Sequence, residues 1–208
     1  FDEIALCQRF QIDGSKVFII PRACKLSSAE PRQTHNSTLV TICRISENQK
    51  NFDAMIGIMA QAPELTLDIY GAGSTEEVSA LESKISGHPN IKFLGKTNDV
   101  AETLSKYSVF IMTSYYEGYG QSLIEARSQG LPIVLFNTFD AAQSVVAHEK
   151  NGFLIEPFDQ TSFREGIRKI LADESVYRRM SKESVALAAT TDSQSIQEKW
   201  LTLFKSFQ

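Results

Sequence analysis

Cysteine is scarce and unpatterned in this sequence. The 208 residues include three cysteines, Cys7, Cys24 and Cys43, which are widely spaced and form no C-x-x-C motif. This number and spacing disfavour a disulfide framework and a zinc site, so the thiols are expected to be reduced. No apolar run reaches the roughly 18 residues of a membrane-spanning helix, and no signal peptide opens the chain, so we expect a cytoplasmic protein.

A surplus of basic residues is also missing. Lysine and arginine number 21 against 25 aspartates and glutamates, which gives a net charge of −4. This balance provides no electrostatic footprint for nucleic acid or another polyanion. The apolar content of 42% allows a substantial core, and the length is that of one domain spanning residues 1–208. Residues 1–11 form a helical pattern with no sheet of their own to pack on, which indicates a fragment.

Short apolar runs alternate with helical patterns along most of the chain. This alternation indicates βαβ units, so the predicted fold is α/β with a Rossmann-like, doubly wound and mostly parallel sheet. The predicted strands are at residues 17–20, 38–42, 65–70, 91–94, 109–112, 133–136 and 152–155. The helices between them are predicted at 51–60, 74–85, 98–107 and 121–129. Residues 158–208 form a helical region, with helices near 160–171, 174–189 and 193–207.

Two cations follow the second predicted strand. In doubly wound sheets, ligands bind at the carboxyl ends of the strands. Arg44 stands just after residues 38–42, and Lys50 stands six residues later, near the start of a helix. Two cations there can clamp a diphosphate. Solvated surface charge is the alternative for any single arginine or lysine, but the strand-end position favours a functional role.

Glycines follow the third and fourth predicted strands. Gly71 and Gly73 form a G-x-G in which a backbone can approach a ligand closely, although a tight turn with a supporting role is favoured. The G-x-G-x-x-G dinucleotide fingerprint is incomplete, because Glu76 occupies its last glycine position. Gly95 and Lys96 stand at the next strand end, where backbone groups can recognise the edge of a base.

The segment from Glu117 to Glu125 sets two carboxylates eight positions apart across a predicted strand-to-helix junction. The helix is expected to begin near Gly120, where free amides and the helix dipole favour a phosphate or sugar oxygen. A carboxylate accepts hydrogen bonds from two vicinal hydroxyls, so ribose or hexose hydroxyls are natural partners of both. The alternative is a capping glutamate followed by an exposed helical one.

Together these residues resemble the carboxyl-terminal, donor-binding half of a GT-B glycosyltransferase of family 4, the retaining group with an E-x(7)-E signature. The resemblance covers nearly the whole chain. It implies that Arg44 and Lys50 bind the donor diphosphate. It also implies that Glu125 holds the ribose hydroxyls and that Glu117 contacts the transferred sugar. The residues between the glutamates are then donor-binding as well: Gly118, Tyr119, Gly120, Gln121 and Ser122.

Further family motifs occur in the same order along the chain. Gly71 and Gly73 match the G-x-G turn, and residues 93–95 match an F-L-G strand end that places Gly95 and Lys96 near the base. Residues 151–154 match a later turn of the family, and residues 18–21 resemble the segment that leads into this domain.

The sequence departs from the family pattern at two places. Cys43 stands where glycine usually precedes the arginine, which affects backbone access near the phosphates. Ala141 and Ala142 replace a pair that commonly contains glycine, in the loop after Asn137, where the sugar or acceptor is often approached. The second departure bears on the identity of the sugar and leaves the predicted fold unchanged.

A metal is not expected to take part. The sequence contains no D-x-D, the motif that clamps a metal-bound diphosphate in the other main glycosyltransferase architecture. Arg44, Lys50 and the helix amino terminus near Gly120 would instead stabilise the departing nucleoside diphosphate. The resemblance implies retention of configuration without a dedicated enzymatic nucleophile. No general base is assigned, because an exposed structural role is expected for each histidine: His35, His88 and His148.

The resemblance also implies partners. The donor would be a nucleoside diphosphate hexose, UDP-linked on family frequency alone, with no other cofactor. The acceptor would be a glycan, a protein or a lipid carrier, as in envelope or capsular polysaccharide synthesis. An acceptor-binding amino-terminal domain, joined through residues 1–20, would be missing from this chain. That domain would provide any peripheral contact with the inner face of a membrane.

Two other classes of protein remain open. One is a non-catalytic partner or chaperone subunit of another transferase, which could lose its donor-binding residues without penalty. The presence of Arg44, Lys50 and Glu125 disfavours this class. The other is a dinucleotide-dependent oxidoreductase domain, which is disfavoured because no phosphate fingerprint follows the first strand.

Overall fold

A six-stranded sheet forms the centre of the computed structural model, which describes residue 7 and residues 9–207. Its strands run parallel in the order β3-β2-β1-β4-β5-β6. They are β1 (Thr38–Arg44), β2 (Thr66–Ala72), β3 (Ile91–Phe93), β4 (Val109–Met112), β5 (Ile133–Phe136) and β6 (Gly152–Ile155). This topology confirms the predicted doubly wound α/β fold.

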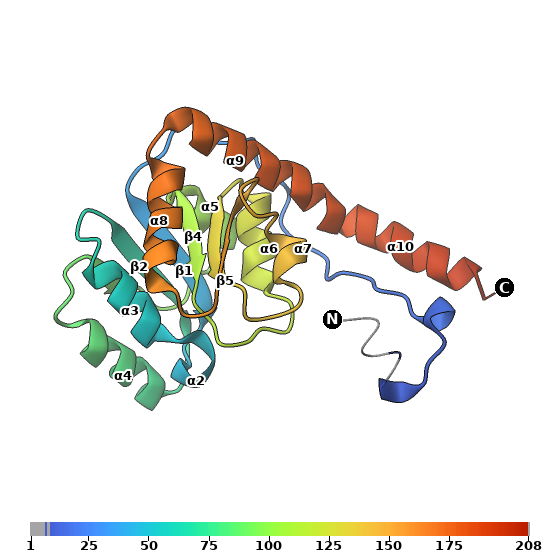
Figure 1. Cartoon of the computed structure of the whole chain (residues 1–208), viewed down its shortest axis with the longest axis horizontal. Helices are drawn as coiled ribbons and strands as arrows, with labels where there is room; N and C mark the ends of the chain where they lie inside the picture. The colour runs from blue at the N-terminus through green and yellow to red at the C-terminus, as the bar shows by residue number, and fades with distance from the viewer. Residues whose placement is uncertain (1–6, 8, 208) are drawn as a thin grey trace.

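Helices connect the strands and cover both faces of the sheet (Figure 1). The crossover helices are α2 (Glu47–Lys50), α3 (Phe52–Ala60), α4 (Thr75–Ile85), α5 (Val100–Ser105), α6 (Gln121–Ser128) and α7 (Ala142–Val145). The carboxyl-terminal helices are α8 (Gln160–Leu171), α9 (Glu174–Ala188) and α10 (Ser193–Lys205). Two short 3-10 turns, η1 (Gly14–Lys16) and η2 (Ala189–Thr191), complete the described elements.

The core is divided into two layers by the alternation of side chains along each strand. In β4, Val109 and Ile111 pack into one layer with α3, α8 and α9, whereas Phe110 and Met112 pack into the other with α5, α6 and α7. All four side chains are buried. Apolar burial on both faces explains why the strand sequences are continuous hydrophobic runs, as parallel sheets require.

The structure corrects two predictions at the edges of the fold. Residues 17–20, predicted as a strand, form no strand, because within the described residues they have no neighbouring strand to pair with. They run beside α10, where the Phe18 and Phe207 rings are 6.4 Å apart. The loop predicted after Asn137 contains the short helix α7. The helix predicted at 1–11 falls mostly outside the described residues.

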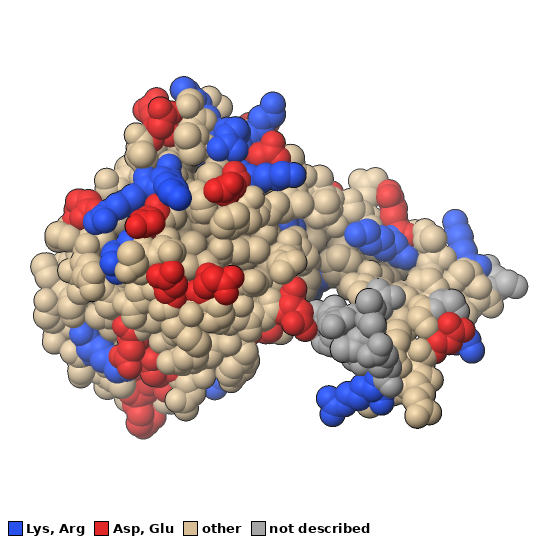
Figure 2. All heavy atoms as spheres, in the orientation of Figure 1, with Lys and Arg blue, Asp and Glu red and all other residues tan. Residues whose placement is uncertain are grey.

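Helix α10 projects away from the sheet, with the segment 9–20 on the same side of the molecule (Figure 1). It exposes the large apolar side chains of Trp200, Leu201 and Phe204. On the face drawn in Figure 2, basic and acidic side chains are interspersed over the carboxyl-terminal helices. None of the helices in the described part of the chain has the length and apolar character needed to cross a membrane.

Candidate functional site

The chain changes direction in the sheet between β1 and β4. The connections from β1 through β2 to β3 proceed towards one edge, and β4, β5 and β6 continue from β1 towards the other. Ligands of doubly wound sheets bind at such a switch point, above the carboxyl ends of the two strands. Arg44 ends β1, and the segment 113–120 follows β4, so the two cations and Glu117 share this crevice.

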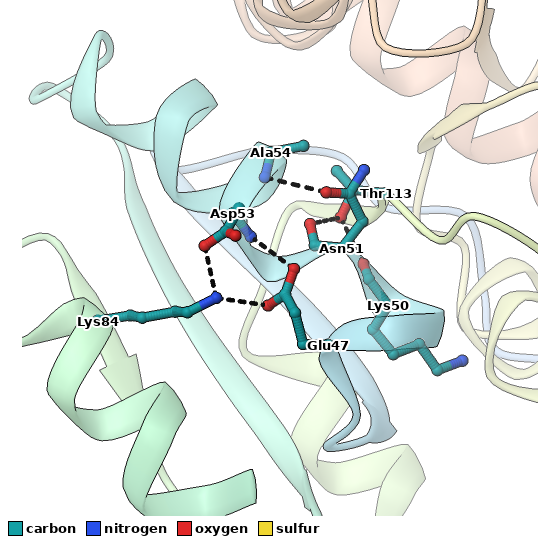
Figure 3. A network of polar contacts seen from close by, with 7 residues as sticks. All are labelled: Glu47, Lys50, Asn51, Asp53, Ala54, Lys84 and Thr113. Atoms are coloured by element: carbon teal, nitrogen blue, oxygen red, sulfur yellow. Dashed lines mark hydrogen bonds and ion pairs between the residues drawn. The ribbon is translucent and has the colours of Figure 1, made fainter.

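Lys50 reaches the crevice from a sharp corner between α2 and α3. Asn51 makes this corner by adopting a left-handed conformation with φ 55°, and its side chain accepts a hydrogen bond from Ala54 N at 3.3 Å. The Thr113 hydroxyl, just after β4, donates to the carbonyl oxygens of Lys50 at 2.9 Å and Asn51 at 3.1 Å. The corner is therefore tied to the end of β4 (Figure 3).

The same corner is held on its outer side by an exposed ion-pair cluster (Figure 3). Lys84 of α4 contacts Glu47 at 3.1 Å and Asp53 at 2.6 Å. Glu47 also accepts a hydrogen bond from the Asp53 amide at 3.3 Å. These contacts connect α2, α3 and α4, so the position of Lys50 is fixed from both sides.

Lys50 and Glu117 form a buried ion pair. Lys50 Nζ contacts Glu117 Oε1, and each side chain is only 8% exposed. The Ser114 hydroxyl donates to the same carboxylate at 2.8 Å, and Gln49 Nε2 reaches its other oxygen at 3.5 Å. Sequence reasoning assigned these two residues to different parts of a donor and missed their contact, because they are 67 positions apart.

Arg44 is the last residue of β1 and is exposed. Its strand partner is Ala72, so the structure places Arg44 beside the G-x-G turn. Its charge also contributes to the low pKa of Glu77, after the larger effect of the hydrogen bond with the Ser74 backbone. The crevice thus has one buried and one exposed cation.

Packing between β1 and β2 explains why the first residue of the G-x-G turn is glycine. A Cβ atom on Gly71 would lie 1.8 Å from the Cys43 carbonyl oxygen, so no larger residue fits between β1 and β2. Gly71 N donates to Gly95 O at 2.8 Å, which brings the two predicted glycine positions together. Lys96 follows with an exposed side chain. Beside the turn, burial raises the pKa of the Cys43 thiol to about 12, so it is not a reactive thiolate.

Helix α6 begins at Gln121, as predicted. Gly120 is its N-cap with φ 83°, a left-handed conformation that glycine adopts without strain. The first turn, which starts with Gln121 and Ser122, has backbone amides without intrahelical acceptors, as at every helix amino terminus. Gly118 is exposed and Tyr119 is half-buried in the loop before it.

Glu125 is half-buried one turn into α6. Gln121 Nε2 donates to its Oε1 at 3.2 Å and lies 3.4 Å from the Ala23 carbonyl oxygen. Burial raises the pKa of Glu125, whereas the hydrogen bond from Gln121 and the charge of Arg22 act in the opposite direction. The segment 22–23 is a neighbour that sequence reasoning missed, because no periodic pattern marks it.

A cavity of about 610 Å³ adjoins this region. Its walls come from four parts of the chain that are distant in sequence: residues 19–23, the loop before α6, residues 140–144 at the start of α7, and helix α10. Gly118 and Tyr119 contribute from the predicted donor segment, and Ala141 contributes from the loop that departs from the family pattern. Its volume is in the range of ligand-binding pockets.

The described residues hold no group of three or more His, Cys, Asp or Glu side chains placed to bind a metal ion. His148 and His35 each contact a neighbouring residue. His148 Nδ1 accepts a hydrogen bond from Leu154 N at 3.2 Å, and the His35 ring lies 5.1 Å from that of Tyr177.

The doubly wound parallel sheet places this chain in the Rossmann-like class of α/β domains. The chain belongs to the glycosyl transferases group 1 family, whose model matches residues 26–185.

Individual relatives agree with this family. The chain is 28% identical over 170 residues to a glycosyltransferase of Haemophilus influenzae. This match covers 79% of this chain and 48% of that protein. The chain is 30% identical over 144 residues to poly(glycerol-phosphate) alpha-glucosyltransferase of Bacillus subtilis, covering 69% of this chain and 21% of that one. Among solved structures, the chain is similar to S. aureus TarM, with a TM-score of 0.82 and 21% sequence identity. The match covers 97% of this chain and 42% of the TarM chain. The chain therefore spans less than half the length of these proteins.

Proposed function

We propose that this chain is the donor-binding domain of a retaining GT-B glycosyltransferase of family 4. It would bind a nucleoside diphosphate hexose, UDP-linked, and take part in transferring the sugar to a glycan, protein or lipid-linked acceptor of the cell envelope. The observation that carries the proposal is the buried pair of Lys50 and Glu117 at the switch point, with Arg44 at the same strand ends.

The charges in the crevice suit a diphosphate. The Lys50 ammonium has three donors, and contact with Glu117 leaves it able to bind a phosphate oxygen as well. Burial strengthens that interaction, because water screens it less. With Arg44 and the amides of the first turn of α6, Lys50 would stabilise the negative charge that develops on the departing diphosphate. Glu117 would orient the transferred sugar, and no metal is required.

The relatives support this proposal. The B. subtilis relative is a glucosyltransferase of poly(glycerol-phosphate), and TarM was solved with UDP and alpha-GlcNAc-glycerol. The chain covers 42% of TarM, so we place the main acceptor-binding surface and full activity in a longer protein with a second domain.

Arg44→Ala tests the diphosphate assignment without disturbing the core, because the side chain is exposed. We expect UDP affinity, measured by calorimetry, to fall by about ten- to a hundredfold, the usual effect of losing a charge-assisted contact. Arg178→Ala, an exposed arginine on α9, is the matched control and should leave the affinity unchanged. Equal affinities for UDP in both variants would contradict the assignment.

Glu125→Gln should have opposite effects on UDP binding and on stability. UDP affinity should fall, and the loss should shrink for a 2′,3′-dideoxy analogue, which lacks the hydroxyls that the carboxylate would accept. Burial raises the pKa of Glu125 in the folded chain above its pKa in the unfolded chain. The free energy of unfolding therefore falls as the pH rises from the unfolded pKa to the folded pKa.

The uncharged glutamine at position 125 removes this pH dependence of stability. The ligand-free variant should therefore melt at a higher temperature than the parent at pH 7, and the difference should vanish below about pH 4.3, the ordinary pKa of glutamate. Exposed Glu183→Gln on α9 is the control for both measurements. Equal loss of affinity for UDP and its dideoxy analogue would remove Glu125 from the ribose.

A further inference from the structure

A second cavity, of about 520 Å³, opens at the carboxyl edge of the sheet beyond β4, β5 and β6. It lies on the opposite side of the switch point from β2 and β3, where Gly71 and Gly95 stand. Tyr115 from the loop after β4, residues 137–143 after β5 and Phe158 after β6 form its walls. None of the predicted donor residues lines this cavity, although its wall includes the loop after Asn137 in which the sequence departs from the family pattern.

Phe158 has an unusual backbone conformation at the wall of this cavity. Its φ is 69°, in the left-handed region that bulky residues rarely occupy because of steric strain. Its side chain is nevertheless 55% exposed. Since strained backbone and exposed aromatic surface both cost free energy, their combination in one residue points to a function.

The aromatic rings around Phe158 hold it in place. Its ring centroid lies 5.7 Å from that of Tyr115, which is 43% exposed, and 5.9 Å from that of buried Phe136. Phe158 precedes Asp159, the N-cap of α8, and Phe136 also lies 5.0 Å from the ring of Phe163 in that helix, so packing at the helix start explains the contact with Phe136. It does not explain the positive φ or the exposed face that Phe158 shares with Tyr115.

Polar groups face the same cavity from fixed positions. The amide side chains of Asn137 and Gln143 line it, and the Asn137 main chain is held to β6 by a 2.7 Å hydrogen bond to Ile155 O. The Thr138 hydroxyl donates to the Ser114 carbonyl oxygen at 2.7 Å. Ser114 in turn donates to Glu117, so the cavity wall is joined directly to the buried ion pair.

We infer that this cavity is a subsite for a pyranose unit of the acceptor, an inference that rests on the proposed function. A pyranose has an apolar C–H face and a rim of hydroxyls. The exposed rings of Phe158 and Tyr115 match the apolar face, and the amides of Asn137 and Gln143 can donate to and accept from the hydroxyls. Its connection to Glu117 places the bound ring next to the transferred sugar.

The subsite can be tested by saturation-transfer NMR on the 208-residue chain with saturating UDP present. Methyl α-D-glucopyranoside and methyl α-N-acetylglucosaminide are the probes, and binding in the millimolar range is expected for one of them. Phe158→Gly removes the ring and relieves the strain, because glycine adopts a positive φ freely, so the variant should fold. It should weaken probe binding about tenfold, as should Tyr115→Ala.

Controls separate this inference from the proposed function. Phe204→Ala removes an equally exposed ring from α10 and should leave probe binding unchanged. UDP affinity should be the same in all these chains. If the parent chain fails to bind UDP, the proposed function fails. If UDP binds but neither probe does, or Phe158→Gly and Tyr115→Ala bind the probe like the parent, the subsite is overturned. Displacement of the probe by a UDP-hexose would also overturn it, since the cavity would then hold the donor sugar.

Discussion

Replacing Lys50 with methionine is expected to lower the free energy of unfolding by about 3–5 kcal/mol and to abolish measurable UDP binding. The substitution leaves the Glu117 carboxylate 8% exposed without its cation, and an uncompensated buried charge is strongly destabilising. Urea unfolding followed by circular dichroism measures the first effect, and calorimetry at a temperature where the variant is folded measures the second.

A second substitution separates the two effects. In Lys50→Met/Glu117→Gln the buried charge is gone, and Ser114 can still donate to the amide oxygen of the glutamine. Most of the lost stability should therefore return, because a buried ion pair can be replaced by uncharged residues at little cost. UDP binding should not return. Recovery of UDP binding in the double variant would show that Lys50 does not contact the diphosphate.

Arg32→Ala is expected to lower the free energy of unfolding by about 3 kcal/mol, the loss of several charge-assisted hydrogen bonds. The Arg32 guanidinium donates to four carbonyl oxygens at 2.9–3.0 Å, those of Leu104, Ser105, Tyr107 and Gln129. Its charge thus lies at the carboxyl ends of both α5 and α6, where helix dipoles favour a cation. Thermal and urea unfolding measure the loss.

The matched control is Arg168→Ala. Arg168 pairs with Glu64 at 3.0 Å, but both side chains are 51% exposed, so the loss should be at most about 1 kcal/mol. Arg32→Lys should restore only part of the stability, because an ammonium cannot reach four carbonyl groups as the guanidinium fork does. Similar losses for Arg32→Ala and Arg168→Ala would contradict the role assigned to Arg32.

Three strands in the second half of the sheet were predictable to the residue. β4, β5 and β6 have the bounds expected from the sequence, and so does α8. Each of these strands is a run of four residues that are all buried, except for the half-buried Leu154 in β6. Short apolar runs between helical patterns are typical of the strands of a parallel sheet. Residues 17–20 show the same pattern but form no strand, since a strand needs a neighbour to pair with.

The candidate site was predictable in composition and only partly in geometry. Arg44 and the glycines at 71 and 95 lie together because parallel strands end at one edge, which follows from the predicted fold. No pattern in the sequence predicted the cavity lined by the exposed rings of Tyr115 and Phe158. A positive φ at a phenylalanine contradicts local preference and comes from the packing of residues distant in sequence.

The sequence by itself determined the alternation of strands and helices, the Rossmann-like class of the domain and the residue types of its candidate site. These depend on local periodicity and on spacing within single βα units. Only the tertiary structure decided that Lys50 pairs with Glu117 and that Glu125 lies beside residues 22–23. These contacts depend on which strands become neighbours, and strand order is set by the packing of the two helical layers as a whole.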